Sequence, residues 1–367
     1  MQNFIMLFIL LLLAGGTTGQ SRTPDPLNYH IRNTHIVDAR TGQILENRDV
    51  FIKDGKIIAI RDAQSRTPPG EWQEIDGTGK YLMPGITEMH AHIPVRREGD
   101  DQNVRETLFL YLSNGITTIR GMLGNPYHLE LKRLVQQDKI LSPRIYTSSP
   151  SMNGNSVQSP EEAIVKVTQY WEDGYDFLKI HPGIKLPVME ALVNTAKQLG
   201  MTFSGHIPYD VGIENALKFG YASIDHADGY IEGMMPAGTN FDAGGFFGSN
   251  FARDVELSRL AGLCRQTAEQ KIWVVPTQSL FTRWVSPDPP EEMIQAPEMQ
   301  YMPASVRYSW VQGKTQILNN PEYSAEDYQV FLKLRKRILK SLYDAQVGFL
   351  LGSDAPQVFN VPGFSAT

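Results

Sequence analysis

The sequence predicts an α/β fold: a (β/α)8 TIM-like barrel preceded by a small N-terminal β-sandwich domain. Short apolar strands alternate with amphipathic helical stretches from about residue 81 onward. Eight such strands within roughly 270 residues match the spacing of a (β/α)8 barrel. An open doubly wound sheet would be expected to show a glycine-rich phosphate turn after its first strand, and the sequence has none.

The N-terminus predicts export. Residues 4–14 are an almost unbroken apolar run, and small and polar residues follow up to Gly19 and Gln20. The run is too short to span a bilayer comfortably and suits the h-region of a secretory signal. We therefore expect a signal peptide at residues 1–19, a secreted or periplasmic protein, and no stable membrane span after cleavage. A retained anchor is the alternative.

Residues 20–80 are expected to form the N-terminal part of the small β domain. Apolar runs at 50–52 and 56–60 flank Asp54-Gly55, a dipeptide typical of a tight hairpin. Residues 81–367 are expected to form the barrel. Its predicted strands lie at 86–91, 115–120, 144–148, 176–181, 201–206, 222–226, 272–277 and 347–353. Predicted helices include 159–172, 187–199 and 324–345, with stops at Leu199-Gly200 and Phe219-Gly220.

Two stretches interrupt this alternation. Residues 228–262 are rich in Gly, Met and Phe, and residues 280–323 are rich in Pro, Glu and Met. Long excursions after barrel strands usually cover the mouth of the active site, so both are interpreted as lid or specificity segments. Surface insertions are the alternative.

Composition limits the class of partner. The chain has 367 residues, 41% of them hydrophobic, and a formal net charge of -6. This balance argues against a nucleic-acid surface and favours a small-molecule or dipeptide substrate. Homo-oligomerisation is left open. The single cysteine, Cys264, cannot form an internal disulfide and is expected to be a buried apolar residue.

Potential metal ligands recur at the predicted strand ends. His90 and His92 are separated by one residue at the end of a strand, so both imidazoles point to the same face. A lone pair of this kind is a weak signal for a metal site. Four further candidates at the ends of other strands make it strong: Lys179, His206, His226 and Asp354.

The motifs at these positions carry a family resemblance. The runs MPGITEMHAHI, GITTIRG, DFLKI, SGHIP, SIDHADG and LGSDAP resemble the amidohydrolase superfamily of metal-dependent hydrolases, and most closely its imidazolonepropionase-like branch, which includes Xaa-Pro dipeptidases. The resemblance implies hydrolysis of a C–N bond by a metal-activated hydroxide. It implies one metal, expected to be zinc, on His90, His92 and Asp354, and a second on His206 and His226.

The resemblance further implies that a carboxylated Lys179 bridges the two metals. An ammonium group would repel metal cations, whereas the carbamate formed with CO2 offers two anionic oxygens. Asp354 and His226 are the predicted catalytic residues, and Asp354 is expected to move a proton from the water to the leaving nitrogen. The alternative for Lys179 is an ion pair with Asp354 in a single-metal site.

Three further residues are candidates for substrate contact. Tyr230 could reach a substrate carboxylate or be a plain loop aromatic, and His181 could contact substrate or serve a structural hydrogen bond. Arg120 could bind an anionic substrate or balance buried carboxylates. His30, His35 and His128 lie outside the barrel strand ends and are expected to be ordinary surface residues.

The family resemblance predicts more chain after Asp354 than the 13 residues that follow it here. We therefore expect a truncated barrel that lacks its last helix and part of the small domain. Two alternative functions remain: a mononuclear imidazolonepropionase-like cyclic amidohydrolase or deaminase, and a catalytically silent fragment.

Overall fold

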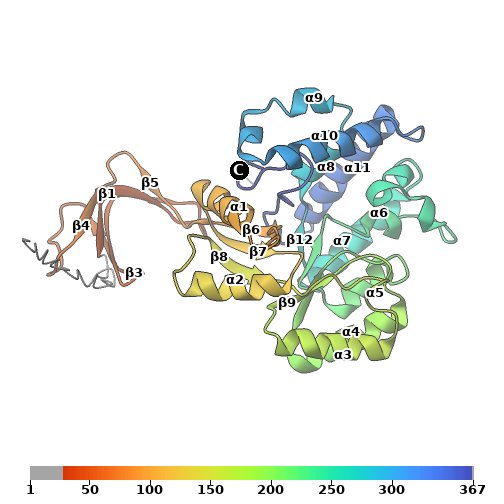
Figure 1. The fold of residues 1–367 in the computed structure, drawn as a ribbon, viewed down its shortest axis with the longest axis horizontal. Coiled ribbons are helices and arrows are strands. Elements are labelled where there is room, and N and C mark those ends of the chain that lie inside the picture. The colour runs from red at the N-terminus through yellow and green to blue at the C-terminus, as the bar shows by residue number, and fades with distance from the viewer. Residues whose placement is uncertain (1–27, 366–367) are drawn as a thin grey trace, which may run out of the picture. The chain divides into compact units, whose positions relative to one another are not determined.

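The computed structural model describes residues 28–365, so the predicted signal peptide lies outside the described residues. The chain divides into two compact units, with the boundary between Pro84 and Gly85 (Figure 1). No helix in the described range has the length and apolarity needed to cross a membrane.

The first unit is one five-stranded sheet. Its strands are β1 (Tyr29–Val37), β2 (Ile44–Lys53), β3 (Lys56–Asp62), β4 (Gln73–Asp76) and β5 (Tyr81–Leu82). The order is β3-β2-β1-β4, and β5 also pairs with β1. The described strands thus form a single layer rather than the two layers of the expected sandwich. The predicted hairpin is present: Asp54 and Gly55 both have positive φ between the paired residues Lys53 and Lys56.

His30 corrects the surface prediction. It is buried on β1, its ring stacks on Phe51 at a centroid distance of 4.2 Å, and its Nε2 lies 3.4 Å from Asp49 Oδ2. Neither ring nitrogen has a hydrogen-bond partner among the described residues, so stacking on Phe51 is the closest packing contact of this buried imidazole.

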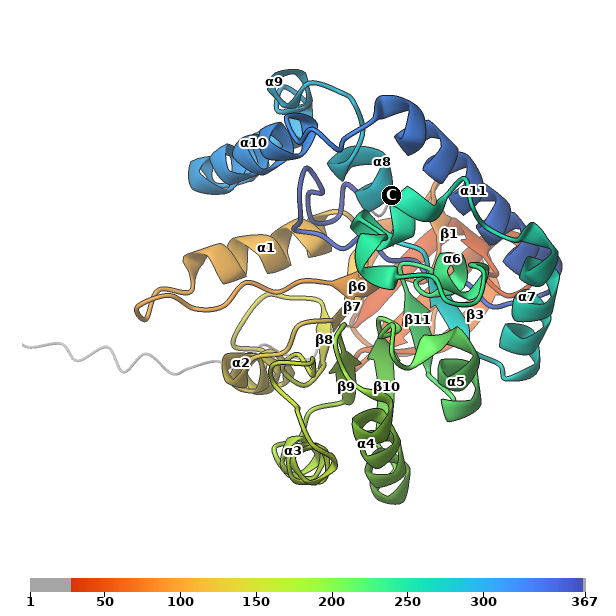
Figure 2. The same cartoon turned by 90° about the vertical axis from the view of Figure 1, so that its right-hand side faces the viewer.

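The second unit contains parallel strands surrounded by helices, as Figure 2 shows. The strands are β6 (Ile86–Ala91), β7 (Ile116–Gly121), β8 (Arg144–Thr147), β9 (Phe177–Ile180), β10 (Thr202–Gly205), β11 (Ser223–Asp225) and β12 (Trp273–Val275). The outer helices are α1 (Gln102–Ser113), α2 (Pro126–Gln136), α3 (Pro160–Glu172), α4 (Leu186–Leu199), α5 (Gly212–Phe219), α7 (Leu260–Glu269) and α11 (Ala325–Asp344). Both predicted helix stops are confirmed, since Gly200 and Gly220 adopt left-handed C-cap conformations.

Seven of the eight predicted barrel strands are present, and the eighth is reduced to a short bridging segment. Within 347–353, only Phe349 forms a β-bridge, with Val274 of β12. Backbone hydrogen bonds nevertheless link this segment to both neighbours, because Val274 donates to Gly348 and Met89 of β6 donates to Leu351. On the opposite side, bridges from Ser148 and Met152 reach β9. These bonds join the two parallel sheets, β6-β7-β8 and β9-β10-β11-β12, into a ring.

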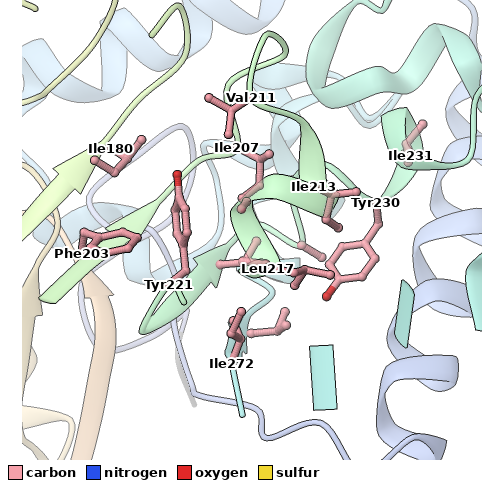
Figure 3. Close-up of a cluster of buried hydrophobic side chains, with 14 of the residues drawn as sticks. Ile180, Phe203, Ile207, Val211, Ile213, Leu217, Tyr221, Tyr230, Ile231 and Ile272 are labelled. Carbon is pink, nitrogen blue, oxygen red and sulfur yellow. The ribbon is translucent and has the colours of Figure 1, made fainter. Parts of the chain in front are cut away.

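The largest apolar core fills the space between the strands and the helices that follow them. Figure 3 shows part of it, with Phe203 and Tyr221 from the strand side facing Ile213 and Leu217 of α5. The Phe203 and Tyr221 rings meet edge to face at 5.0 Å. Cys264 is buried in the same cluster, as expected. This core fixes the carboxyl ends of β9 to β12, where the candidate ligands lie.

The two predicted excursions contain only short or peripheral elements. Residues 228–262 include α6 (Tyr230–Gly233) and the 3-10 turns η1 (Phe241–Ala243), η2 (Phe246–Phe251) and η3 (Leu257–Arg259). Residues 280–323 include most of α8 (Gln278–Trp284), then α9 (Pro290–Met293), η4 (Pro297–Tyr301) and α10 (Ala304–Leu318). Phe246, Phe247 and Trp284 from these excursions line the candidate site described next.

Candidate metal centre

Two histidines and one carboxylate meet at the end of β6. His92 Nε2 lies 2.6 Å from Asp354 Oδ1, and His90 Nε2 lies 3.4 Å from the same oxygen. The backbone N–H of Asp354 donates to the carbonyl of His90, which fixes the approach of the two segments. Burial alone would raise the pKa of the Asp354 carboxyl, but the two imidazoles outweigh it and hold that pKa well below its usual range.

A second cluster shares His90 and adds two consecutive residues, Asp225 and His226. His90 Nδ1 lies 3.3 Å from Asp225 Oδ2, and the His90 and His226 ring centroids are 4.6 Å apart. Strand alternation would send neighbouring side chains to opposite faces. His226 escapes this rule because it follows the strand with a φ of 62°. This left-handed turn brings both side chains to one site.

Lys179 is buried on β9 and pairs with Asp225. Its Nζ lies 2.7 Å from Asp225 Oδ2, and the side chains are 1% and 0% exposed. The sequence alternative of an ion pair for Lys179 is therefore realised, but with Asp225 in place of Asp354. Burial raises the pKa of the Asp225 carboxyl, yet Lys179 and His90 overcome this effect and keep that pKa well below its usual range.

The imidazoles of His206 and His226 present their Nε2 atoms to the site. His206 Nδ1 lies 3.2 Å from the Asp228 carboxylate, which can only accept, and His226 Nδ1 lies 2.8 Å from Thr277 Oγ1. The Thr277 hydroxyl itself donates to the Pro276 carbonyl, so its oxygen accepts from His226. Both Nδ1 atoms therefore carry the proton, and both Nε2 lone pairs are available to a metal.

His181 lies beside these ligands. Its ring stacks on His206 at 5.0 Å, and its Nδ1 lies 2.8 Å from Ser151 Oγ. Burial and the neighbouring Lys179 lower the pKa of His181 to about 2, so its ring is neutral. Its position is compatible with both roles expected for it, substrate contact and structural hydrogen bonding.

All six predicted ligands line one cavity of about 190 Å³. Its lining residues are His90, His92, Lys179, His181, His206, His226, Phe246, Phe247, Leu280, Trp284, Asp354 and Gln357. The structure thus brings together side chains from five strand ends that the sequence separates by as many as 264 positions.

Two of the three predicted substrate contacts lie elsewhere. Tyr230 is fully buried in the core beside Ile213 and Leu217, as Figure 3 shows, and its hydroxyl pairs with Thr267 of α7 at 2.7 Å. Arg120 lies inside the barrel, where it donates to the Met89 carbonyl and to Ser223 Oγ and lies 3.5 Å from Asp225 Oδ1. The expected substrate contacts of Tyr230 and Arg120 are therefore corrected, and Arg120 balances a buried carboxylate.

Three positioning residues were not identified from the sequence. Glu88 accepts hydrogen bonds from the backbone N–H groups of His90 and Ser353, both at 2.9 Å, and so ties β6 to the segment that carries Asp354. Asp228 orients His206, as described above. The third, Arg335 of α11, is buried and donates to the His226 carbonyl at 2.8 Å. Asp225, described above, was also not identified, although its position directly before a strand-end His was a usable signal. No sequence signal pointed to Arg335.

The donor set fits a divalent metal ion. Within residues 28–365, two groups have ligand atoms within 4.8 Å of one another: His90, Asp225 and His226, and His90, His92 and Asp354. His90 Nδ1 is buried without a hydrogen-bond partner among the described residues. Burial, with His206 and His90 nearby, holds the pKa of His226 well below its usual range, so its imidazole is neutral, as a ligand must be.

The chain is similar in sequence to curated enzymes. It is 28% identical over 223 residues to an adenine deaminase of Ruegeria sp. (strain TM1040), a match that covers 56% of this chain and 36% of that protein. It is 34% identical over 93 residues to a dihydroorotase of Thermus aquaticus, covering 25% of this chain and 18% of that protein. The chain thus spans about a third or less of the length of these curated relatives.

Solved structures share the fold over most of the chain. A bottromycin amidohydrolase matches with a TM-score of 0.70 at 22% identity, covering 93% of this chain and 72% of that one. A putative prolidase from Bifidobacterium longum matches with a TM-score of 0.63 at 19% identity, covering 93% and 77%. At this identity the likeness shows the fold. Residues 81–257 match the family model described as the amidohydrolase family, and the chain therefore carries an amidohydrolase family domain.

Proposed function

We propose that this protein is a metal-dependent hydrolase that cleaves an amide-type C–N bond in a dipeptide or a cyclic amide. One observation carries the proposal: two groups of metal-ligand atoms share His90, and all of their residues except Asp225 line one cavity at the carboxyl ends of the barrel strands. The relatives and structural neighbours are named as an adenine deaminase, a prolidase and a Xaa-Pro dipeptidase, which supports this substrate class.

Zinc is the proposed metal because the donors are imidazole nitrogens and carboxylate oxygens. His90, His92 and Asp354 would hold one ion, and His206 and His226 would hold a second. When bound, such an ion polarises a carbonyl and lowers the pKa of water from about 15.7 to about 7.

Asp354 is the proposed proton carrier. Hydrolysis forms a C–O bond to water, breaks the C–N bond and moves one proton from the water to the departing nitrogen. The Asp354 carboxylate lies among His90, His92 and His226, and its depressed pKa keeps it ionised, the only form in which it could accept that proton. Asp228 and Thr277 hold His206 and His226 in the tautomers that metal binding requires.

Lys179 is the proposed site of the carbamate. Its unprotonated Nζ would attack CO2, form an N–C bond and release one proton. In the structure Lys179 Nζ instead pairs with Asp225 Oδ2 at 2.7 Å, and this contact supports a mononuclear cyclic amidohydrolase as the second candidate. A mass increase equal to one CO2 on the peptide containing Lys179 supports the carbamate. Its absence from protein reconstituted with zinc and bicarbonate favours the mononuclear site.

The experiment that tests the function is a hydrolysis screen of zinc-reconstituted protein. Xaa-Pro dipeptides, other dipeptides, N-acyl amino acids and cyclic amides form the panel, and metal content is measured in the same samples. We expect turnover of at least one C–N substrate with one or two zinc ions per chain. A folded, zinc-loaded protein that cleaves none of them contradicts the proposal.

A further inference from the structure

The candidate metal cavity has two chemically different sides. One side consists of the imidazoles and carboxylate described above. The other consists of Phe246, Phe247, Leu280 and Trp284, which we call the aromatic wall. The wall comes from the two excursions, η2 and α8, so it is supplied by the segments that interrupt the regular barrel.

The rings of the aromatic wall form a continuous contact from the metal ligands to Trp284. The Phe247 ring lies 5.0 Å from that of His226 and 5.6 Å from that of His206. Phe246 lies 4.7 Å from Phe247 and 4.9 Å from Trp284, in both cases edge to face. These are the separations and orientations of attractive aromatic pairs. A group held at the metal ligands would therefore be in contact with π surface.

The backbone of η2 is arranged to aim Phe247 inward. Phe247 has a φ of 52°, and the neighbouring Gly248 has a φ of 73°. A side chain at Gly248 would also place its Cβ 2.8 Å from a carboxylate oxygen of Glu232. Left-handed backbone is unfavourable for a residue with a side chain, and such strain is typical of sites where a ring must be held in one place.

The wall is also supported from behind. Phe281, fully buried on α8, packs edge to face on Phe247 at 5.0 Å and lies 5.8 Å from Phe246. The guanidinium of Arg335 covers Phe281, with its Cζ 3.4 Å from the ring centroid. Because Phe281 and Arg335 pack behind the aromatic wall, the wall should keep its shape when substrate binds, as a surface that determines specificity requires.

We propose that the aromatic wall selects substrates that carry a planar apolar group next to the scissile C–N bond, with Phe247 and Trp284 as the specificity-determining residues. This inference rests on the proposed hydrolase function and adds the substrate class. In this proposal the catalytic side of the cavity binds the amide group, and the aromatic wall contacts the substituent next to it. A small aliphatic substituent leaves the ring faces uncovered and gains less from binding.

The kinetic test compares N-benzoylglycine with N-acetylglycine and Phe-Pro with Gly-Pro, on zinc-reconstituted protein. We expect kcat/KM to favour the aromatic member of a hydrolysed pair by about tenfold or more. Phe247→Ala and Trp284→Ala should each remove most of this preference, because kcat/KM falls more for the aromatic substrate than for the small one. Phe241→Ala is the matched control, because Phe241 lies in the same excursion but does not line the cavity.

A binding measurement separates this inference from the proposed function. Calorimetric titration of benzylphosphonate and methylphosphonate into the zinc-loaded protein should give about tenfold tighter binding of the aromatic ligand, and Phe247→Ala should abolish the difference. That result upholds the wall even if no substrate is cleaved. Hydrolysis without aromatic preference, or phosphonates that bind equally or not at all, overturns it. Phe247→Leu, checked by its melting temperature, replaces Phe247→Ala if the alanine variant does not fold.

Discussion

The guanidinium of Arg335 donates a hydrogen bond of 2.8 Å to the backbone carbonyl of His226, 109 residues away in sequence. The same group donates to the Pro276 carbonyl at 3.0 Å and to Gln278 Oε1 at 3.2 Å. One buried side chain of α11 therefore holds the ends of β11 and β12, where His226 and its partner Thr277 both have positive φ. The other basic residues of this part of α11, Lys333, Lys336 and Arg337, are exposed.

Replacement of Arg335 should weaken the site that His226 belongs to. Arg335→Met leaves the buried His226 carbonyl without a donor, while Pro276 keeps its bond from the Thr277 hydroxyl, and we expect the free energy of unfolding to fall by about 1–3 kcal/mol. Zinc affinity and the cobalt absorption spectrum, measured on folded protein, should change as well. Arg337→Met is the matched control, since Arg337 is exposed on the same helix. An unaltered cobalt spectrum in Arg335→Met would contradict a positioning role.

The Lys179–Asp225 pair predicts a strong asymmetry between single and double variants. Asp225→Asn leaves a buried ammonium without its counter-charge, so we expect a loss of about 3–5 kcal/mol in the free energy of unfolding. Lys179→Met combined with Asp225→Leu removes both charges and should recover part of that stability, since Arg120 still loses its carboxylate partner. Denaturant unfolding of the metal-free proteins measures both. A double variant no more stable than Asp225→Asn would show that the pair does not act as a unit.

Asp354→Asn should separate chemistry from metal binding. The amide keeps one oxygen ligand but cannot accept a proton, so turnover should fall by about 10² or more. Zinc content, measured by elemental analysis, should remain close to that of the unmodified protein. Near-normal turnover with full zinc occupancy would remove Asp354 from the mechanism.

His128 predicts a pH dependence of stability. It is buried on α2, which corrects the surface prediction, and its Nε2 lies 3.3 Å from the Pro94 carbonyl. Burial lowers its pKa to about 4, so between pH 6.5 and 4 the unfolded chain binds a proton that the folded chain does not.

The free energy of unfolding should therefore fall as the pH decreases through this window, by up to about 3 kcal/mol from His128 alone. His128→Gln should flatten the dependence by that amount. Urea unfolding at a series of pH values checks the slope. The same slope in both proteins would assign the dependence to other groups.

The sequence predicts those parts of the molecule that local pattern controls. Strand ends, helix stops and the ligand positions His90, His92, His206, His226 and Asp354 follow from periodicity, spacing and family resemblance. Side-chain contacts that depend on the tertiary structure cannot be predicted in this way. Lys179 finds Asp225, 46 residues away, because both face the barrel interior. Tyr230 fails as a substrate contact because α6 turns its ring into the core, which spacing after His226 cannot reveal.

Ring closure between the segment after α11 and β6 has a consequence for how the protein matures. Ser353 donates to Glu88 across 265 positions of chain, and Asp354 reaches His90 over a similar span. Contacts this distant in sequence form late, since the chain entropy lost in closing such a loop is regained only when most of the barrel is in place. We therefore expect the complete three-residue ligand set of His90, His92 and Asp354 to arise at the final step of folding. Completely folded barrels would then bind metal at this site, and folding intermediates would not.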